Sequence, residues 1–256
     1  MWMKFQEMTA FELRDVDREN VLVIIPIAAV EQHGPHMPTG TDNFLCTGVV
    51  ESLEQRIPQQ ILLTPTQWLG ASAHHLRLGA TLDAPLEHYI ETLMGMVRSV
   101  LKDGFRRVLL LNGHGGNIDP MRVALRRLQN DYVDRLLAAA CYWDVADSLI
   151  SETLEGDHKF VGHACEFETS MLMHLRPELV KTDLLNDAGE LITDNLDGVY
   201  ISRDLRQRTA EGCTGRPDLA SAEKGAVLFD GIVTAMEQTV VNLLQQPTGL
   251  EYEDHL

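Results

Sequence analysis

Residues Val21–Asp42 have the sequence VLVIIPIAAVEQHGPHMPTGTD, and this stretch decides the interpretation of the fold. Its first part, Val21–Val30, is an apolar run that predicts a buried strand. The part that follows contains carboxylates and imidazoles among glycines and prolines, which disfavour a helix: Glu31, His33, His36 and Asp42. Oxygen and nitrogen ligands gathered at the end of a strand are what a divalent metal ion requires. The stretch therefore predicts a metal-dependent enzyme.

Strand-like and helix-like segments alternate along the rest of the chain. Short apolar runs predict further strands at Ile61–Thr66, Arg107–Asn112 and Leu137–Trp143. Apolar residues at helical spacing predict helices at Leu86–Leu101, Met121–Asn130 (with Asp119 and Pro120 as cap and first turn), Glu166–Leu175 and Ser221–Leu244. The alternation favours an α/β sandwich around a mainly parallel sheet, in a single domain that spans residues 1–256. Such sheets bind ligands beyond the carboxyl ends of their strands.

Composition limits the classes of function. The net charge of −17 argues against a nucleic-acid partner, because phosphate repels an acidic surface. The longest apolar runs, such as Val21–Val30, are shorter than the roughly 20 residues of a membrane span, so no membrane partner is expected. The N-terminus lacks the pattern of a signal peptide, and we expect a cytoplasmic protein. The four cysteines have no paired spacing, which argues against disulfides and against a cysteine zinc site.

A second motif, Leu110–Asn117, ends the predicted strand at Arg107–Asn112 with the sequence NGHGGN. It presents His114 as a further metal-ligand candidate. Gly115 and Gly116 let backbone N–H groups approach a substrate closely, before a helix whose N-terminus favours negative charge. The alternative interpretation is a simple tight turn between strand and helix.

A third motif, Val161–Ser170, contains three ionisable side chains near the start of a predicted helix. His163 and Glu166 are candidates for general acid and base, and Glu168 is a candidate for an additional carboxylate ligand. Ordinary helix capping also explains a glutamate in a first helical turn.

Two loops are candidates for substrate contact. Leu69–Thr81 offers Ser72 and His75 together with His74, although a plain surface loop has the same composition. Asn186–Gly215 is polar and rich in turn residues, which predicts a long loop near the site or at a subunit contact. Trp68 and Trp143 are candidates for pocket walls or for core residues.

The motifs together resemble the creatininase family of metal-dependent amidohydrolases. The resemblance rests on EQHGPHMPTGTD, NGHGGN, HACEFETS and the late segment GRPDLASAEKG, and it covers roughly Glu7 to Leu244. It implies a three-layer αβα fold, two divalent metal ions per chain (zinc first, manganese or iron as alternatives) and a homohexamer. The implied substrate is a small molecule.

The resemblance also implies roles for individual residues. Glu31 and His114 would bind one metal ion and His33 the other, with Asp42 bridging the two. His163 matches the catalytic histidine. Apart from the resemblance, the loops and motifs themselves give the expected substrate contacts: His36, Ser72, His75, Gly115 and Gly116.

One departure from the family pattern concerns the residues after His114. Creatinine-hydrolysing members have a tyrosine and a metal-binding glutamate where this chain has Gly115 and Gly116. The missing carboxylate is expected from Glu168 or Glu166; otherwise the second metal ion is held more weakly. Creatinine is therefore not the expected substrate.

The expected reaction is hydrolysis of an amide bond in a small cyclic or formamide-type substrate, by water that two metal ions activate. His163 or Glu166 would pass a proton to the leaving nitrogen. One alternative is a carbonyl hydrolase that opens a keto-cyclitol ring at a carbon–carbon bond. A second is a protein that binds metal or a small molecule without catalysis.

Overall fold

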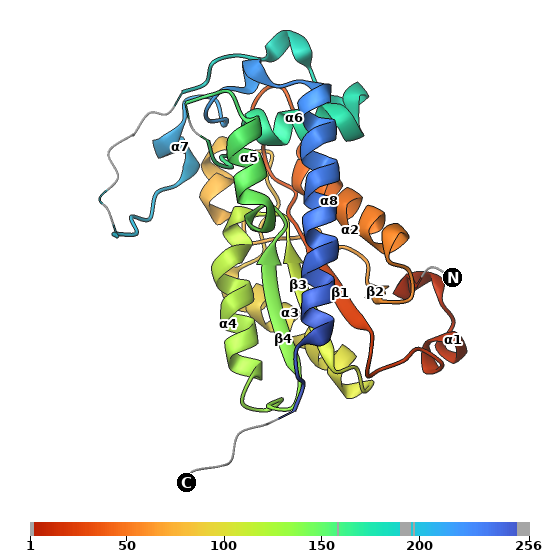
Figure 1. Ribbon diagram of the computed structural model, residues 1–256. Coiled ribbons are helices and arrows are strands. Elements are labelled where there is room, and N and C mark those ends of the chain that lie inside the picture. The colour runs from red at the N-terminus through yellow and green to blue at the C-terminus, as the bar shows by residue number, and fades with distance from the viewer. Residues whose placement is uncertain (1–2, 158, 190–195, 197, 250–256) are drawn as a thin grey trace.

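The computed structural model describes residues 3–157, 159–189, 196 and 198–249. A sheet with the order β2-β1-β3-β4 lies at its centre (Figure 1). Its strands are β1 (Leu22–Ile27), β2 (Ile61–Leu63), β3 (Arg107–Asn112) and β4 (Leu136–Cys141), and every pair is parallel. Ile27, Asn112 and Cys141 stand beside one another in register, so β1, β3 and β4 end at the same edge.

Helices cover both faces of this sheet. Leu22 and Ile24 pack into one buried cluster with α2 (Thr41–Arg56), α5 (Asp147–Thr153), α6 (Glu166–Leu175) and α8 (Ala222–Gln245). Val23 and Ile25 point to the other face and pack with α3 (Leu86–Lys102) and α4 (Ile118–Leu128). The alternation of side chains along a strand thus divides the core into two layers. The predicted α/β class and three-layer arrangement are confirmed.

The remaining elements are short and lie in the connections. They are α1 (Ala10–Arg14), α7 (Leu205–Arg208) and the 3₁₀ helices η1 (Phe5–Glu7), η2 (Ala73–Leu78), η3 (Gly115–Asn117), η4 (Asp144–Ala146), η5 (Pro177–Leu179), η6 (Thr182–Leu184) and η7 (Pro217–Leu219). Of the segment 186–215, residues 190–195 and 197 fall outside the described part of the chain.

The predicted boundaries of β3 and α6 and the predicted start of α8 agree with the structure. β3 and α6 have the predicted ends, and α8 begins after Ser221, whose hydroxyl accepts a hydrogen bond from the N–H of Lys224. The predicted cap of α4 was wrong: Asn117 is the N-cap, and Asp119 lies inside the first turn. β1 is shorter than its apolar run, because residues 28–30 leave the ladder while remaining within the protein.

The expectation that no segment is long and apolar enough to cross a membrane was wrong for α8. Its length and composition meet that requirement, although the helix lies against α2 and α6. Its inner side contributes Leu228, Ile232 and Val240 to the buried core. A core helix with this packing passes the same length and composition test, so the finding is weak evidence for a membrane span.

Candidate metal centre

The carboxyl ends of β1 and β3 bring the first two motifs together. The strands pair in register up to Ile27 and Asn112, so the loops that follow them leave the same edge of the sheet. A buried cluster lies at this edge and joins side chains from four segments: Glu31, His33, Asp42, His75, His114, His163 and Glu168. The sequence motifs are thus far apart along the chain and adjacent in space.

The loop between β1 and α2 is held by its own backbone. The N–H of Glu31 donates to the carbonyl of Thr39 at 2.9 Å, and the N–H of Thr41 donates to that of Pro38 at 3.2 Å. Gly34 has a φ of 63°, a left-handed conformation that favours glycine. Asp42 lies in the first turn of α2, so its carboxylate projects from a rigid element rather than from the predicted loop.

Backbone carbonyls orient the two histidines that face Asp42. Nδ1 of His33 lies 3.0 Å from the carbonyl oxygen of Glu31, and Nε2 of His114 lies 3.2 Å from that of Ala71. A carbonyl only accepts, so each of these nitrogens carries the proton. The other ring nitrogen of each histidine therefore faces the carboxylates of the cluster, where it could coordinate a metal ion after releasing its proton.

The asparagines of the NGHGGN motif fix the position of His114. The side chain of Asn112 accepts from the N–H of His114 at 3.0 Å and donates to its carbonyl at 2.7 Å. Asn117 donates to the carbonyl of Ala28 at 3.1 Å and accepts from the N–H of Ala71 at 3.0 Å. Asn112 was expected only to turn the chain, and hydrogen-bonding side chains at both ends of a glycine turn were the available signal for this further role.

Asp42 is shared between two sets of potential ligands. With Glu31 and His114 it forms one group, in which Nδ1 of His114 lies 3.0 Å from Oδ2 of Asp42. With His33 and Glu168 it forms the other, in which Nε2 of His33 lies 3.0 Å from Oδ1 of Asp42. This is the arrangement that the bridging hypothesis requires, with Glu168 in the place of the missing carboxylate.

The buried carboxylates of the cluster favour the binding of a cation. Both carboxylate oxygens of Glu31 are buried without a hydrogen bond from any described residue, although Nε2 of His75 and Nδ1 of His114 lie 3.2 Å from Oε1. A buried carboxylate without a partner is costly, and a metal ion removes that cost. Glu31, Asp42 and Glu168 supply three oxygens that suit one or two divalent ions.

Burial and neighbouring charges shift the pKa values of His33 and Glu168. Burial lowers the pKa of His33, but the carboxylates of Asp42 and Glu168 outweigh it and raise that pKa to about 10. Burial is also the main influence on Glu168, where it raises the pKa of the carboxyl. The same buried carboxylates that attract protons to His33 would attract a metal ion.

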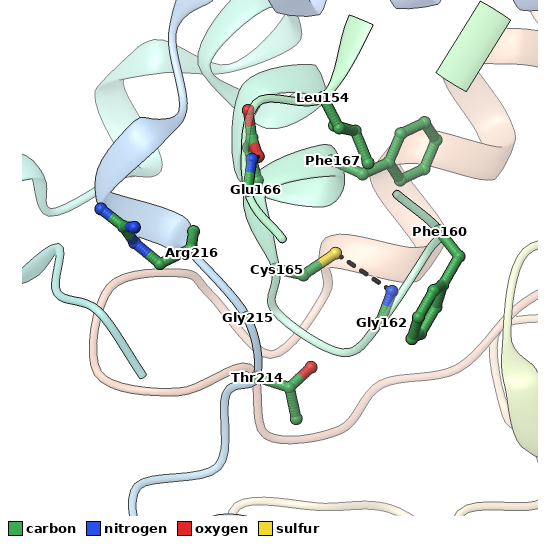
Figure 2. A pocket seen from close by; sticks show the side chains of 10 residues that line it. Leu154, Phe160, Gly162, Cys165, Glu166, Phe167, Thr214, Gly215 and Arg216 are labelled. Carbon is green, nitrogen blue, oxygen red and sulfur yellow. Dashed lines mark hydrogen bonds between the residues drawn. The ribbon is translucent and has the colours of Figure 1, made fainter. Parts of the chain in front are cut away.

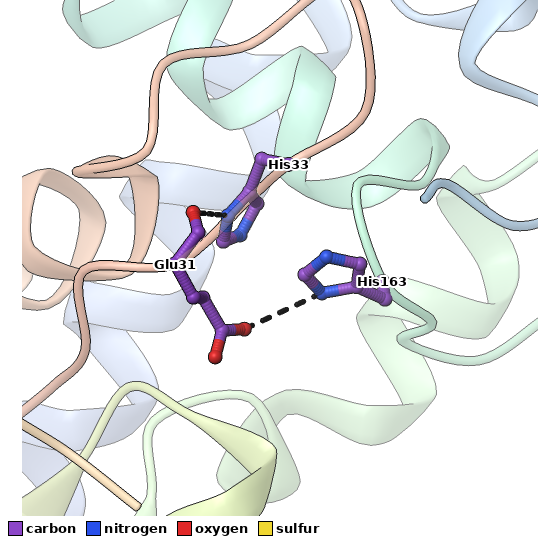
Figure 3. Close-up of side chains that lie close together, drawn as sticks. All are labelled: Glu31, His33 and His163. Atoms are coloured by element: carbon purple, nitrogen blue, oxygen red, sulfur yellow. Dashed lines mark hydrogen bonds and ion pairs between the residues drawn. The ribbon is translucent and has the colours of Figure 1, made fainter. Parts of the chain in front are cut away.

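His163 faces the same cluster from the loop before α6 (Figure 3). Its Nε2 lies 2.8 Å from the carbonyl oxygen of Gln32 and therefore donates to it, which leaves the Nδ1 lone pair 3.6 Å from Oε1 of Glu31. Burial and the nearby His33 hold the pKa of His163 well below its usual value. His163 thus presents an uncharged ring nitrogen to the centre.

Glu166 and Glu168 lie in the first turn of α6, but their carboxylates have different partners. The N–H of Ala164 donates to Glu168 at 2.6 Å, and Glu168 lies in the cluster. The carboxylate of Glu166 instead accepts from Nζ of Lys224 at 2.6 Å and from the N–H of Gly156 at 2.9 Å. It lines a separate pocket of about 20 Å³, room for a single water molecule (Figure 2). The structure therefore does not place Glu166 where a catalytic acid would act.

A cavity of about 220 Å³ opens onto the cluster. Its lining includes Glu31, Asp42, His74, His75, His114, Gly115, Trp143, His163, Glu168, Leu205 and Arg208. His75, Gly115 and Trp143 thus stand where substrate contact is possible. Trp68 is half exposed and does not line this cavity.

Three predicted substrate contacts lie behind the cavity wall. His36 is fully buried and its Nε2 bonds the hydroxyl of Thr169 at 2.9 Å. The Ser72 hydroxyl lies 3.4 Å from Nε2 of His114, where it supports that ring. A side chain at Gly116 would meet the carbonyl of Ala71 at 2.1 Å, so the glycine permits close packing rather than substrate contact. For these three residues the structure supports a role in shaping the site.

The sequence did not indicate a role at the site for Leu205, Arg208 or Gln32. Leu205 and Arg208 line the cavity from α7, and Gln32 donates from its amide to Nδ1 of His75 at 3.0 Å. The turn-rich composition of 186–215 predicted a loop near the site but not which side chains enter it. Gln32 lies between two suspected ligands, and this position was the available signal.

Comparison with known proteins agrees with this geometry. Residues 6–240 match the Creatininase family, described as creatinine amidohydrolase. The chain is 26% identical to the 3-dehydro-scyllo-inosose hydrolase of Thermotoga maritima, over 96% of this chain and 85% of the relative. It is 28% identical to the mycofactocin precursor peptide peptidase of Mycobacterium ulcerans (89% and 88%) and 26% identical to the creatinine amidohydrolase of Pseudomonas putida (86% and 88%).

Solved structures share the fold. A manganese creatininase superposes with a TM-score of 0.83 at 24% identity, over 96% of this chain and all of the other. A creatininase variant of the zinc–zinc type superposes with a TM-score of 0.80 at 24% identity, over 95% and 98%. With the family match over nearly the whole sequence, the conclusion is direct: this chain belongs to the creatininase family of metal-dependent hydrolases.

Proposed function

We propose that this protein hydrolyses the amide bond of a small polar substrate, with two divalent ions bound at the cluster. The observation that carries the proposal is the pair of ligand groups that share Asp42, one with Glu31 and His114 and the other with His33 and Glu168. Zinc is the first choice of ion, and manganese and iron are the alternatives. The zinc–zinc and manganese creatininases of the same fold support zinc and manganese.

Each group of residues has a distinct task in this proposal. When bound, divalent ions would supply a water molecule with a pKa lowered toward about 7 and a Lewis acid for the substrate carbonyl. Glu31, Asp42 and Glu168 hold the ions and balance their charge. The carbonyls of Glu31 and Ala71 fix the rings of His33 and His114 so that their lone pairs face the ions.

His163 is the residue that we propose for proton transfer to the leaving nitrogen. The Nε2 proton is donated to the carbonyl of Gln32, so Nδ1 would accept the proton that the attacking water gives up and return it to the amide nitrogen as the C–N bond breaks. We propose this role for His163 rather than for Glu166, because the carboxylate of Glu166 accepts hydrogen bonds from Lys224 and from the backbone of Gly156.

The identity of the substrate is limited by the site and by the relatives. The absence of a side chain carboxylate at Gly115 and Gly116 still argues against creatinine. A peptide-like or formamide-type amide suits a site with a proton donor for nitrogen, and one relative is a peptide peptidase. Opening of a keto-cyclitol ring is the second candidate, which the inosose hydrolase among the relatives favours.

A turnover screen with and without metal tests the proposal. Cyclic amides, formamides, short peptides and keto-cyclitols are offered to zinc-, manganese- and iron-loaded protein, and then to chelator-treated protein. The proposal is supported if chelator abolishes amide hydrolysis and added metal restores it. The same hydrolysis should be absent in the Asp42→Ala variant. Cyclitol opening without amide hydrolysis selects the second candidate, and turnover that persists without metal rejects both.

We also propose a homo-oligomer, a hexamer by family resemblance, in the cytoplasm. Half-exposed apolar side chains in one segment support self-association: Trp68, Leu76, Leu82 and Leu86. Light scattering on purified protein measures the mass directly.

A further inference from the structure

Arg208 adds a guanidinium to the wall of a cavity whose other ionisable side chains are carboxylates and imidazoles. It lies at the end of α7 and lines the cavity together with Glu31, Asp42 and Glu168. Arg208 is the arginine in this cavity wall, so its guanidinium is available to a substrate that enters the cavity.

The segment that carries Arg208 is fixed in place. Asp204 caps α7 by accepting from the N–H of Gln207 at 3.1 Å, and it pairs with Arg77 of η2. Leu205 is buried beside the cavity, and the Thr209 hydroxyl donates to the carbonyl of Cys213 at 2.6 Å. The position of α7 over the cavity is thus held from both ends, so Arg208 is presented to the site by a built element.

The Arg208 guanidinium has no ion-pair partner among the residues that the structure describes. Other arginines near the site do: Arg77 pairs with Asp204, and Arg216 pairs with Asp218 at 2.7 Å. A half-buried guanidinium with free N–H donors beside a cavity favours an anionic ligand that accepts two parallel hydrogen bonds.

We propose that Arg208 binds an anionic group of the substrate, a carboxylate or a phosphate, and so selects substrates that carry one. This inference rests on the proposed amide hydrolysis and deepens it, because it adds a charged group to the substrate at the α7 side of the cavity. The metal ions offset the carboxylates of the cluster, so the anion binds to the metal-loaded protein. A terminal carboxylate of a peptide-like amide and a phosphate ester share this chemistry, whereas a neutral cyclitol lacks it.

Binding of matched ligands tests the inference. The probes are N-acetylglycine, its neutral amide N-acetylglycinamide, and N-acetyl-2-aminoethyl phosphate, titrated calorimetrically into metal-loaded wild type, Arg208→Gln and Arg208→Lys. Arg206→Gln is the control, since Arg206 is exposed on the same short helix and does not line the cavity. If a probe is hydrolysed, its KM replaces the dissociation constant.

The expected result is that an anionic probe binds the wild type more tightly than the neutral amide. Arg208→Gln should weaken the anionic probe by about 10- to 100-fold, the range for one charge-assisted pair, and leave the neutral probe and the metal content unchanged. Arg208→Lys should recover part of the loss, and Arg206→Gln should change nothing. Preference between the carboxylate and the phosphate probe identifies the anion.

Three outcomes overturn the inference: no binding of either anion to the wild type, equal losses for charged and neutral probes, or full anion affinity in Arg208→Gln. The proposed function fails by a different readout, namely hydrolysis that is indifferent to chelator. A protein that keeps its metal-dependent amide hydrolysis but shows one of these three outcomes rejects Arg208 alone.

Discussion

Glu166 and Glu168 stand in the same turn of α6, yet their carboxylates lie in different surroundings. Glu168 lies with His33 and Asp42 in the cluster, and Glu166 pairs with Lys224 in the neighbouring pocket. Sequence alone could not separate them, because both are glutamates of a first helical turn and only Glu166 pairs with a residue of the distant helix α8. Lys224 is the residue that distinguishes the two in space.

This difference predicts opposite phenotypes for matched variants. Glu168→Gln should lose one metal ion per chain and most of its turnover, because a neutral amide replaces a buried carboxylate ligand. Glu166→Gln should keep its metal ions and lose stability by about 1–3 kcal/mol, because a charged hydrogen bond is weakened while Lys224 keeps its pair with Glu155. Elemental analysis and urea unfolding measure the two effects. Loss of metal from Glu166→Gln with retention in Glu168→Gln would reverse the assignment.

The pair between Glu166 and Lys224 also predicts a pH dependence. Burial lowers the pKa of Lys224, but its hydrogen bonds to Glu155 and Glu166 outweigh this and raise the pKa above 10.5. A raised lysine pKa in the folded state stabilises the protein fully below 10.5, and this contribution disappears as the pH rises through the folded-state pKa. Urea unfolding should therefore show the free-energy difference between wild type and Lys224→Met shrinking above pH 10.5. A difference that stays constant from pH 8 to 11 would contradict this.

At the scale of the element, the packing of α8 against α6 depends on the absence of a side chain. A Cβ at Gly225 would lie 1.9 Å from the carbonyl oxygen of Ser170. Backbone in α6 would have to move, and α6 carries Glu168. The contact thus links the last helix of the sandwich to the position of a proposed ligand.

Two glycine-to-alanine variants test this packing. Gly225→Ala should destabilise the protein despite the better helix propensity of alanine, because the clash is with backbone. Gly95→Ala is the control, since Gly95 is exposed within α3 with nothing within 4 Å of its Cβ position, and it should stabilise by about 0.5–1 kcal/mol. Thermal unfolding compares the two variants. Equal stabilisation of both would mean that α6 and α8 separate more easily than the structure indicates.

The sequence predicted best those elements whose ends are marked by glycine or proline. β3 is apolar along its length and ends at the NGHGGN turn, and α6 stops before Pro177, so both had clear ends. α2 was missed although Leu45, Cys46, Val49 and Leu53 have helical spacing, because the glycines and prolines before it suggested a continuing loop. The consequence was that Asp42 was placed on a loop instead of in a helical turn.

At the scale of the whole molecule, the site exists because the sheet is parallel. Parallel pairing of β1 with β3 sends two ligand-bearing loops to one edge, and the helices of one face add Asp42 and Glu168. The motifs predicted this convergence from their positions after strands. The contribution of α7 was beyond prediction, since nothing in the sequence indicates that Arg208 folds back over the edge.

Metal stoichiometry tests the central claim most directly. Protein is stripped with chelator, reloaded with zinc, dialysed and measured by elemental analysis, in parallel with Asp42→Ala, whose folding is checked by circular dichroism. We predict two ions per chain in the wild type and a loss of both in folded Asp42→Ala, because Asp42 belongs to both ligand groups. A wild type that retains no ion, or an Asp42→Ala variant that retains two, would contradict the proposed dinuclear centre.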